Sequence, residues 1–342
     1  MSDIRVGIVG LGRLGKTHAI NLAENVPGAK LVAACSYVEE ELEYAKRELG
    51  VTETYISYEE MVESPNLDAV CIVSPSGYHP EQIRLAMEKG LHVFSEKPIG
   101  LDIEDIKRTM EVIHAHPDQV FQLGFMRRYD ESYQYAKKMV DEGTLGELTV
   151  IRCYGIDPSS GMEGFVKFAR SSNSGGLFSD MSIHDIDLVR WFSKKEVSRV
   201  WAMGKNAAYP ELDDLNELET GAAMMQLDDK TMAILVAGRN AAHGYHVETE
   251  LIGTKGMLRV AAAPEKNLVT IFDENGVVRP TSQNFPERFK DAFVNEMREF
   301  ISCIKEKRQP EVGAIDGLQS TRVAIACQQS VEANQIVEVE YK

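Results

Sequence analysis

The chain has 342 residues, of which 44% are hydrophobic and 26% are charged, and its formal net charge is −16. This length suits two domains, because a single core usually stops growing near ~250–300 residues. The acidic balance argues against broad nucleic-acid binding and against polybasic membrane attachment, since both need a basic surface. We therefore expect a globular protein whose partners are small molecules.

Cysteine usage and the start of the chain point to a reducing compartment. The five cysteines are scattered and form no CxxC pair, which favours small core residues over a disulfide framework or a zinc site. The chain starts MSDIRVGIVG, without a cationic leader followed by a long apolar run. It also lacks an apolar stretch of the ~18 residues that a membrane span needs. We expect a cytoplasmic protein without a membrane anchor or a bound metal.

The first part of the chain alternates apolar strands with amphipathic helices. Strands are predicted at 4–10, 30–35, 68–74, 92–97 and 120–125, with helical patterns between them. Continuous apolar strands separated by helices indicate a parallel sheet that is covered on both faces. We predict an α/β fold that begins with a doubly wound Rossmann domain over residues 1–124.

The second part of the chain has a different pattern. Long consecutive strands are predicted at 147–156, 198–206, 218–227, 231–240, 246–254, 256–263 and 267–274. Strands without intervening helices indicate a mostly antiparallel sheet. Helices are predicted at 130–143, where the helix bridges the domains, and at 178–193, 288–307 and 316–334. We predict an α+β domain over residues 125–342, with a C-terminal helix that packs back on the Rossmann domain.

A glycine motif opens the first predicted helix. Gly10-Leu11-Gly12-Arg13-Leu14-Gly15 is a GxGxxG directly after the first predicted strand. In this context the first glycine permits a tight turn, the second lets the backbone approach a pyrophosphate, and the third allows close helix–strand packing. The helix N-terminus then offers N–H groups to the phosphates. We predict that this segment binds a dinucleotide; the alternative is that its glycines serve packing only.

The second strand does not end in the carboxylate that an NAD site usually carries about 20 residues beyond the glycines. Cys35-Ser36-Tyr37 stands there, and Glu39 is the first acid. We expect Ser36 to bond a ribose hydroxyl and Tyr37 to flank the adenine. A 2′-phosphate is not repelled here, but no arginine follows Ser36 to clamp it. We favour NAD, and NADP stays open.

Lys97 is the first candidate catalytic residue. Glu96-Lys97-Pro98 follows a predicted strand, and carboxyl ends of parallel strands face the ligand crevice. Lys97 is therefore expected near the nicotinamide; the alternative is a surface lysine in a loop.

A second cluster lies on the helix predicted at 178–193. Asp180 and His184 are four residues apart there, and Asp187 follows three residues later. A histidine that titrates near neutrality suits removal of a hydroxyl proton, and a neighbouring carboxylate can orient it. The alternative is a hydrogen-bonded core histidine. A metal site is the weaker interpretation, because no further ligands have suitable spacing.

Taken together, these motifs resemble the Gfo/Idh/MocA family of sugar and cyclitol dehydrogenases. The resemblance covers the whole chain and is carried by GLGRLG, VSPSGYH, EKP, GFMRRY, GGLFSDMSIHDID and DGLQSTRVAIACQQS, in this order. It implies a Rossmann domain joined to a substrate-binding domain with an open, mostly antiparallel sheet, through which members usually form homodimers or homotetramers. It also implies a catalytic set in which His184 takes the hydroxyl proton while Asp180 and Lys97 position substrate hydroxyls. The cofactor set implied by the resemblance adds Ser74, Pro75, His79 and Glu96.

Within this family, the segment 124–130 is most similar to inositol dehydrogenases. The resemblance implies substrate contacts for Arg127, Asp157 and Tyr245; the alternatives are an interdomain salt bridge for Arg127 and an interface aromatic for Tyr245. The segment 154–158 is closer to the scyllo-inositol branch than to the myo-inositol branch. Phe293 stands where members often have a tyrosine.

The sequence therefore predicts an NAD-dependent inositol 2-dehydrogenase that produces an inosose, with scyllo-inositol ahead of myo-inositol. Three alternatives remain: an aldose or other sugar dehydrogenase, a non-catalytic dinucleotide-binding regulator of sugar metabolism, and a glycosidase or lyase that oxidises its substrate transiently. Retention of Lys97, Asp180 and His184 together counts against a regulator.

Overall fold

The computed structural model describes residues 2–171, 174–261, 265–274 and 276–341. The chain divides into two compact units: Met1–Tyr129 with Asp291–Leu318, and Asp130–Lys290 with Gln319–Lys342. By these contacts the segment Asp291–Leu318 belongs with the N-terminal residues. The division into domains at residue 124 remains a proposal about which parts fold independently.

The first unit contains the predicted parallel sheet. Six strands lie in the order β3-β2-β1-β4-β5-β6, and every neighbouring pair is parallel. Their bounds are β1 Ile4–Val9, β2 Ala29–Cys35, β3 Glu53–Tyr55, β4 Ala69–Ile72, β5 His92–Glu96 and β6 Phe121–Gly124. Five of them confirm the predicted strands. The sequence analysis missed β3, because a three-residue edge strand is too short to show a pattern.

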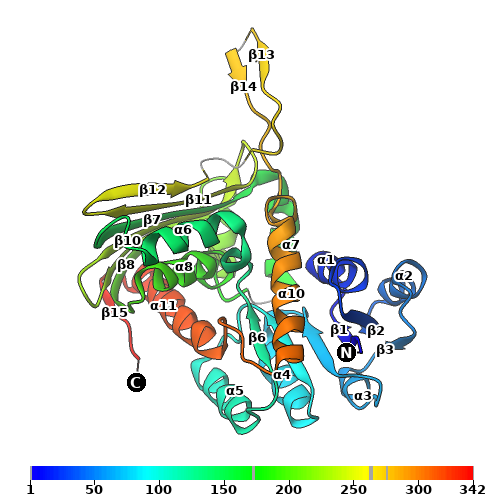
Figure 1. Ribbon diagram of the computed structural model, residues 1–342. Helices are drawn as coiled ribbons and strands as arrows, with labels where there is room; N and C mark the ends of the chain where they lie inside the picture. Colours follow the sequence, from blue (N-terminus) through cyan, green and yellow to red (C-terminus); the bar gives the residue numbers. More distant parts are fainter. Residues whose placement is uncertain (1, 172–173, 262–264, 275, 342) are drawn as a thin grey trace. The chain divides into compact units, whose positions relative to one another are not determined.

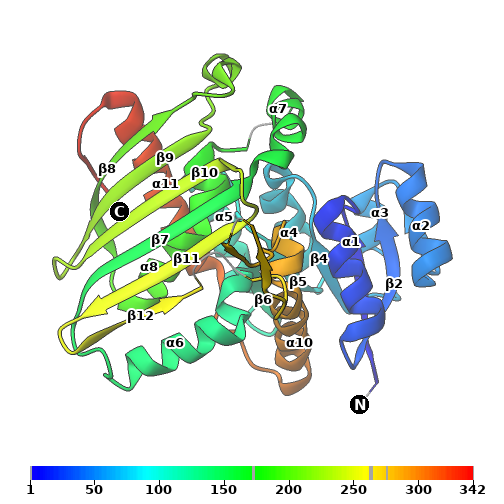
Figure 2. The ribbon, with the colours of Figure 1, turned by 90° about the horizontal axis from the view of Figure 1, so that it is seen from above.

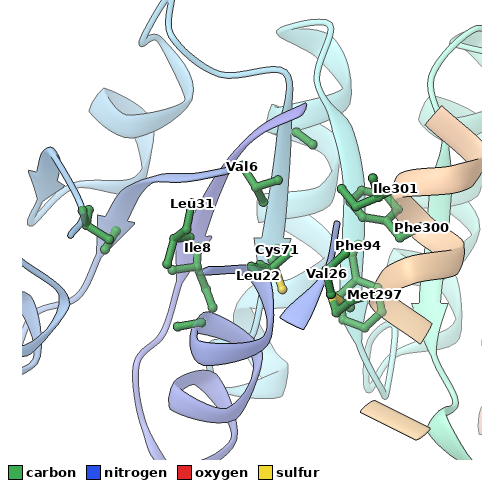
Figure 3. Close-up of a cluster of buried hydrophobic side chains, with 14 of the residues drawn as sticks. Val6, Ile8, Leu22, Val26, Leu31, Cys71, Phe94, Met297, Phe300 and Ile301 are labelled. Atoms are coloured by element: carbon green, nitrogen blue, oxygen red, sulfur yellow. The ribbon is translucent and has the colours of Figure 1, made fainter. Parts of the chain in front are cut away.

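Helices connect these strands and supply most of the remaining core (Figure 1). They are α1 Arg13–Ile20, which continues as a π-helical turn η1 at Asn21–Asn25, then α2 Glu39–Leu49, α3 Tyr58–Val62, α4 His79–Glu88, α5 Ile103–Ala115 and α10 Lys290–Glu306. The 3₁₀ turns η2 Ser76–Tyr78 and η3 Met126–Tyr129 follow β4 and β6. Figure 3 shows how α10 completes the core, where Met297, Phe300 and Ile301 gather near Phe94 of β5. This packing explains why a C-terminal segment belongs to the first unit.

The second unit contains a seven-stranded sheet in the order β12-β11-β7-β10-β9-β8-β15. The bounds are β7 Leu148–Pro158, β8 Val197–Lys205, β9 Thr220–Leu227, β10 Met232–Ala241, β11 His246–Gly253, β12 Gly256–Val260 and β15 Val337–Glu338. Only β10 and β7 pair in parallel; the other pairs are antiparallel. The prediction of a mostly antiparallel sheet is confirmed. A separate hairpin, β13 Ile271–Asp273 with β14 Gly276–Val278, extends from the sheet (Figure 1).

Helices cover one face of this sheet. They are α6 Glu131–Asp141, α8 Ile183–Ser193 and, from Gln319 onward, α11 Ala314–Ala333 (Figures 1 and 2). The helix α7 Met162–Ser171 was not predicted, although Met162, Phe165 and Val166 follow a helical spacing. The short helices η4 Ser159–Gly161, η6 Pro210–Leu215 and α9 Phe285–Arg288 were not predicted because they are too short to show a period. The last predicted residues of the strand 256–263 lie partly outside the described residues. Within the described part of the chain, the helices are too short or too polar to cross a bilayer.

Candidate active site

In the glycine loop between β1 and α1, the fold requires Gly10 and Gly15 but leaves room for a side chain at Gly12. Gly10 has φ +86°, and a Cβ there would lie 2.5 Å from the carbonyl oxygen of Val73. A Cβ on Gly15 would collide with the carbonyl oxygen of Gly10. A Cβ on Gly12 would meet nothing within 4 Å. The second glycine therefore leaves room for an external group, as expected where a pyrophosphate approaches the backbone.

The N-terminus of α1 presents its amides at the same place. Gly12 is the N-cap residue, and no side chain caps the helix there. Backbone N–H groups at such an end, together with the helix dipole, attract a phosphate. Arg13 is exposed and Leu14 is half-buried in this first turn. The loop therefore fits the diphosphate of a dinucleotide.

The end of β2 carries an acidic group that the sequence analysis missed. The Ser36 hydroxyl donates to the Glu41 carboxylate at 2.6 Å, and the backbone N–H of Val38 donates to the Ser36 oxygen at 3.1 Å. Glu41 lies in the first turn of α2, two residues beyond Glu39. Only the folding of this helix brings its carboxylate to Ser36. Tyr37 beside them is 81% exposed, which leaves its ring accessible to an adenine. A carboxylate at this strand end disfavours a 2′-phosphate.

His79 joins two loops of the first unit. Its Nδ1 lies 2.8 Å from the carbonyl oxygen of Pro98, and its Nε2 lies 2.7 Å from the carbonyl oxygen of Ser74. The side chain is almost completely buried, and burial lowers the pKa of its imidazole, which the two carbonyl groups partly oppose. Ser74 also donates its hydroxyl to Gln82 at 2.6 Å. His79 thus braces the loops that follow β4 and β5, and its predicted role at the cofactor stays a prediction.

Glu96 is the last residue of β5, and Lys97 follows it in the loop. The backbone N–H of Lys97 donates to the Glu96 carboxylate at 3.2 Å, and the Lys97–Pro98 peptide is cis. Lys97 is half-buried, whereas Glu96 is buried. Gly124 pairs with Glu96 in the sheet, and a Cβ on Gly124 would lie 3.1 Å from the Glu96 carboxylate. The strand end is therefore shaped around this carboxylate.

Asp180 and His184 lie where a π-helical turn enters α8. The π turn η5 spans Phe178–Ser182, and α8 begins at Ile183. Both side chains are half-buried, while Asp187 is almost fully buried. The predicted helix is confirmed, but its first turn is π rather than α. Such turns are frequent at functional sites.

The structure adds Arg239, which the sequence analysis missed. Arg239 lies in β10, is nearly buried, and forms an ion pair with Asp180 at 2.9 Å. Its guanidinium also stacks 3.6 Å from the centre of the Phe165 ring in α7. One signal was present in the sequence: a charged residue interrupts the apolar strand predicted at 231–240. The signal was missed because its partner, Asp180, is distant in the chain.

The remaining predicted site residues are distributed over both units. Arg127 is buried in η3 of the first unit. Asp157 is half-buried near the end of β7, and Tyr245 is buried just before β11, with its ring at the edge of Phe289. Their roles toward a substrate remain predictions.

Comparison with known proteins places this architecture in a family. The model described as an oxidoreductase family with an NAD-binding Rossmann fold matches residues 4–125, and the GFO/IDH/MocA C-terminal domain matches residues 133–259. The chain belongs to the Gfo/Idh/MocA family. As a member of this family, it is an oxidoreductase with an NAD-binding Rossmann domain, which confirms the fold and cofactor predicted from its motifs.

Several relatives within the Gfo/Idh/MocA family are inositol dehydrogenases. The scyllo-inositol 2-dehydrogenase (NAD(+)) of Bacillus subtilis is 31% identical, over 99% of this chain and 97% of its own length. A structure of scyllo-inositol dehydrogenase from Lactobacillus casei with bound NAD(H) and scyllo-inositol is 61% identical over 99% of both chains, with a TM-score of 0.97. The myo-inositol 2-dehydrogenase of Lactobacillus plantarum is 47% identical over 99% of this chain and 100% of that one, with a TM-score of 0.98.

Proposed function

We propose that this protein is an NAD-dependent inositol 2-dehydrogenase that oxidises a ring secondary alcohol to an inosose, with scyllo-inositol preferred to myo-inositol. The observation that carries this proposal is the 61% identity, over 99% of both chains, to a scyllo-inositol dehydrogenase with NAD(H) and scyllo-inositol bound. The lower identity of 47% to a myo-inositol 2-dehydrogenase keeps myo-inositol as the second candidate substrate.

The cofactor is assigned to the first unit. The Gly10–Gly15 loop and the amides of α1 would hold the diphosphate, Ser36 with Glu41 the adenosine ribose, and Tyr37 the adenine. When bound, NAD supplies the hydride acceptor for the reaction. The carboxylate of Glu41 next to Ser36 favours NAD over NADP, because it repels a 2′-phosphate.

The chain's own residues handle the proton and the substrate. We assign His184 as the base that takes the proton from the reacting hydroxyl, because imidazole titrates near neutrality. Asp180, held by Arg239, accepts a hydrogen bond from a substrate hydroxyl, and Lys97 donates one. Arg127, Asp157 and Tyr245 are proposed to contact the other ring hydroxyls. Oxidation thus removes a hydride from carbon and a proton from oxygen.

The direct test is the identity of the product. Incubation with NAD and scyllo-inositol should yield a six-membered ring ketone, detected by carbon NMR, in amounts equal to the reduced cofactor formed. Cofactor reduction without a ring ketone would refute the reaction, and cofactor reduction with an aldose but not with scyllo-inositol would indicate a sugar dehydrogenase instead.

We also propose that the protein is a cytoplasmic homo-oligomer, a tetramer or a dimer, that assembles through the sheet of the second unit. The face opposite α6 and α8 exposes apolar side chains from β8, β9, β10 and β12, namely Trp201, Met203, Met224, Met232 and Met257. An apolar patch of this kind usually marks an interface. Light scattering should give the mass of an oligomer, and Met224→Glu should lower it; a monomeric wild-type protein would contradict the proposal.

A further inference from the structure

A buried group of three ionisable side chains lies in the first unit behind the end of β5. His18 of α1 and Glu296 of α10 are 0% exposed, and Glu96 of β5 is 7% exposed. One imidazole nitrogen and one oxygen from each carboxylate lie within 4.8 Å of one another. Charged groups are almost never this deeply buried unless they are paired. The question is therefore which of these three side chains are charged and how those charges are paired.

His18 and Glu96 form the bonded pair of this cluster. The Nε2 atom of His18 lies 2.7 Å from one carboxylate oxygen of Glu96. The other oxygen of Glu96 accepts the backbone N–H of Lys97 at 3.2 Å. Both oxygens of Glu96 are thus engaged, one by the imidazole and one by the loop that carries Lys97.

Glu296 stands apart from this pair. Its nearer oxygen lies 3.9 Å from the Nε2 atom of His18, which is beyond hydrogen-bond distance. Among the described residues, neither Glu296 oxygen has a hydrogen-bond partner. An ionised carboxylate in this position would be buried without hydrogen bonds and close to a second carboxylate, whereas the neutral acid avoids most of that cost.

The surroundings of Glu296 offer it little compensation. The His18 ring packs on Phe94 and on the edge of Phe293, with ring centres 5.3 and 5.5 Å away. Met297, Phe300 and Ile301 follow on the same helix in the apolar core (Figure 3).

Four further titratable groups face the carboxylates from neighbouring elements: Cys71 of β4, His79 of α4, Tyr129 of η3, and Lys97. Burial raises the pKa of Glu296 well above its ordinary value, and the charge of Glu96 raises it further.

We propose that Glu296 is kept as the neutral acid, so that His18 pairs with Glu96 alone and Glu96 holds the backbone of Lys97 in place. His18, Glu96 and Glu296 are then positioning residues for Lys97, which rests on the catalytic role proposed for that lysine. Loss of the Glu296 proton places a second negative charge beside Glu96 and makes both carboxylates compete for His18. The cluster therefore sets an alkaline limit on the stability of this unit and on the placement of Lys97.

A metal ion is the alternative occupant of this site, since one imidazole and two carboxylates are suitable ligands. The direct 2.7 Å contact between His18 and Glu96 favours a shared proton, because a metal between these atoms would hold them farther apart. Elemental analysis of the purified protein decides this point. A stoichiometric metal whose removal by a chelator lowers the melting temperature would overturn the proposal.

The sign of the pH effect follows from the raised pKa. The unfolded chain releases the Glu296 proton near pH ~4.3, whereas the folded chain retains it to a higher pH. The stabilising contribution is therefore complete below pH ~4.3 and is lost as the pH rises through the folded pKa. Glu296→Gln keeps the shape of the neutral acid but has no proton to lose. Between the pKa of Glu296 in the unfolded chain and its pKa in the folded chain, the folding equilibrium constant of the wild type should fall about tenfold per pH unit relative to that of the variant.

The test combines denaturant unfolding across this pH range with infrared spectroscopy. The carbonyl band of a buried protonated carboxyl group should be present in the wild type near neutral pH and absent from Glu296→Gln. Glu111→Gln, an exposed position on α5 of the same unit, is the matched control and should behave as the wild type. Parallel pH curves for the wild type and Glu296→Gln, or no such band, would overturn the proposal. Neither readout needs a substrate, so both stand even if the proposed reaction is wrong.

A kinetic arm tests the link to Lys97. His18→Gln keeps a donor near the Nε2 position but removes the imidazole, and it should lower kcat and raise the KM for inositol while the Kd for NAD stays unchanged. The kcat of the wild type should decline at alkaline pH, and Glu296→Gln should lack this decline. If His18→Gln loses NAD affinity and turnover in equal proportion, the cluster supports the cofactor loop rather than Lys97.

Discussion

The Arg239 guanidinium forms an ion pair with the Asp180 carboxylate, with 2.9 Å between the paired atoms and side-chain exposures of 5% and 36%. The arginine is also fixed by stacking on Phe165, so it orients the carboxylate without covering it. Asp180 thereby has a fixed, partly exposed carboxylate four residues before His184. This relationship gives the proposed substrate site a rigid acceptor.

The first prediction concerns this ion pair. Arg239→Lys keeps the positive charge but loses the planar fork and its stacking on Phe165. Because small displacements of a positioning group are costly, kcat should fall by roughly tenfold to a hundredfold. Steady-state kinetics with titration of NAD checks this, and NAD affinity should be unchanged. Arg279→Lys, in an exposed pair with Glu265, is the control. A wild-type kcat in Arg239→Lys would show that the ion pair does not position Asp180 for catalysis.

The second prediction concerns the proposed catalytic residues. Lys97→Ala and His184→Ala should each reduce turnover by about 10²–10⁴-fold, the usual contribution of a positioned acid or base. NAD binding, measured by calorimetry, should persist because the diphosphate loop is intact. Lys89→Ala, an exposed lysine paired with Glu63, controls for loss of surface charge. Near-normal turnover in either variant would exclude that residue from the mechanism.

The third prediction concerns cofactor choice. Glu41→Gln removes the carboxylate that accepts the Ser36 hydroxyl, so a 2′-phosphate meets less repulsion. The preference for NAD over NADP, as a ratio of kcat/KM values, should fall by about tenfold, which corresponds to ~1.4 kcal/mol. Glu43→Gln on the same helix is the matched control, since Glu43 pairs with exposed Lys46. An unchanged ratio in Glu41→Gln would mean that Glu41 does not face the ribose.

The fourth prediction separates the two functions of the glycine loop. Gly12→Ala should weaken NAD binding with little change in melting temperature, because a Cβ there meets no protein atom within 4 Å. Gly15→Ala should instead destabilise the fold by at least ~1–3 kcal/mol, because its Cβ would collide with the Gly10 carbonyl. Thermal unfolding and NAD titration of both variants give the comparison. Equal loss of stability in the two variants would contradict the division.

Whether a feature of the fold or of the candidate site could be predicted from the sequence depends on how far apart in the chain the interacting residues lie. Strands with continuous apolar runs, the glycine loop and the helix around His184 carry local patterns, and the structure confirms them. Arg239 and Glu296 each depend on a partner far away in the chain. The charge of Arg239 in an apolar strand was visible in the sequence, but no local pattern shows which residue either side chain contacts. Glu41 was overlooked for a different reason: the fold of α2, rather than distance in sequence, brings it to Ser36. Local chemistry therefore predicts the candidate reacting groups, whose roles stay predictions, whereas the residues that hold them in place were found only in the structure.

The most direct test of the central claim is the initial rate of NAD reduction with scyllo-inositol, myo-inositol, D-chiro-inositol and glucose, each repeated with NADP. We predict the highest kcat/KM for scyllo-inositol with NAD, followed by myo-inositol. A higher kcat/KM for glucose than for either of these inositols, or NAD binding without reduction by any of the four compounds, would contradict it.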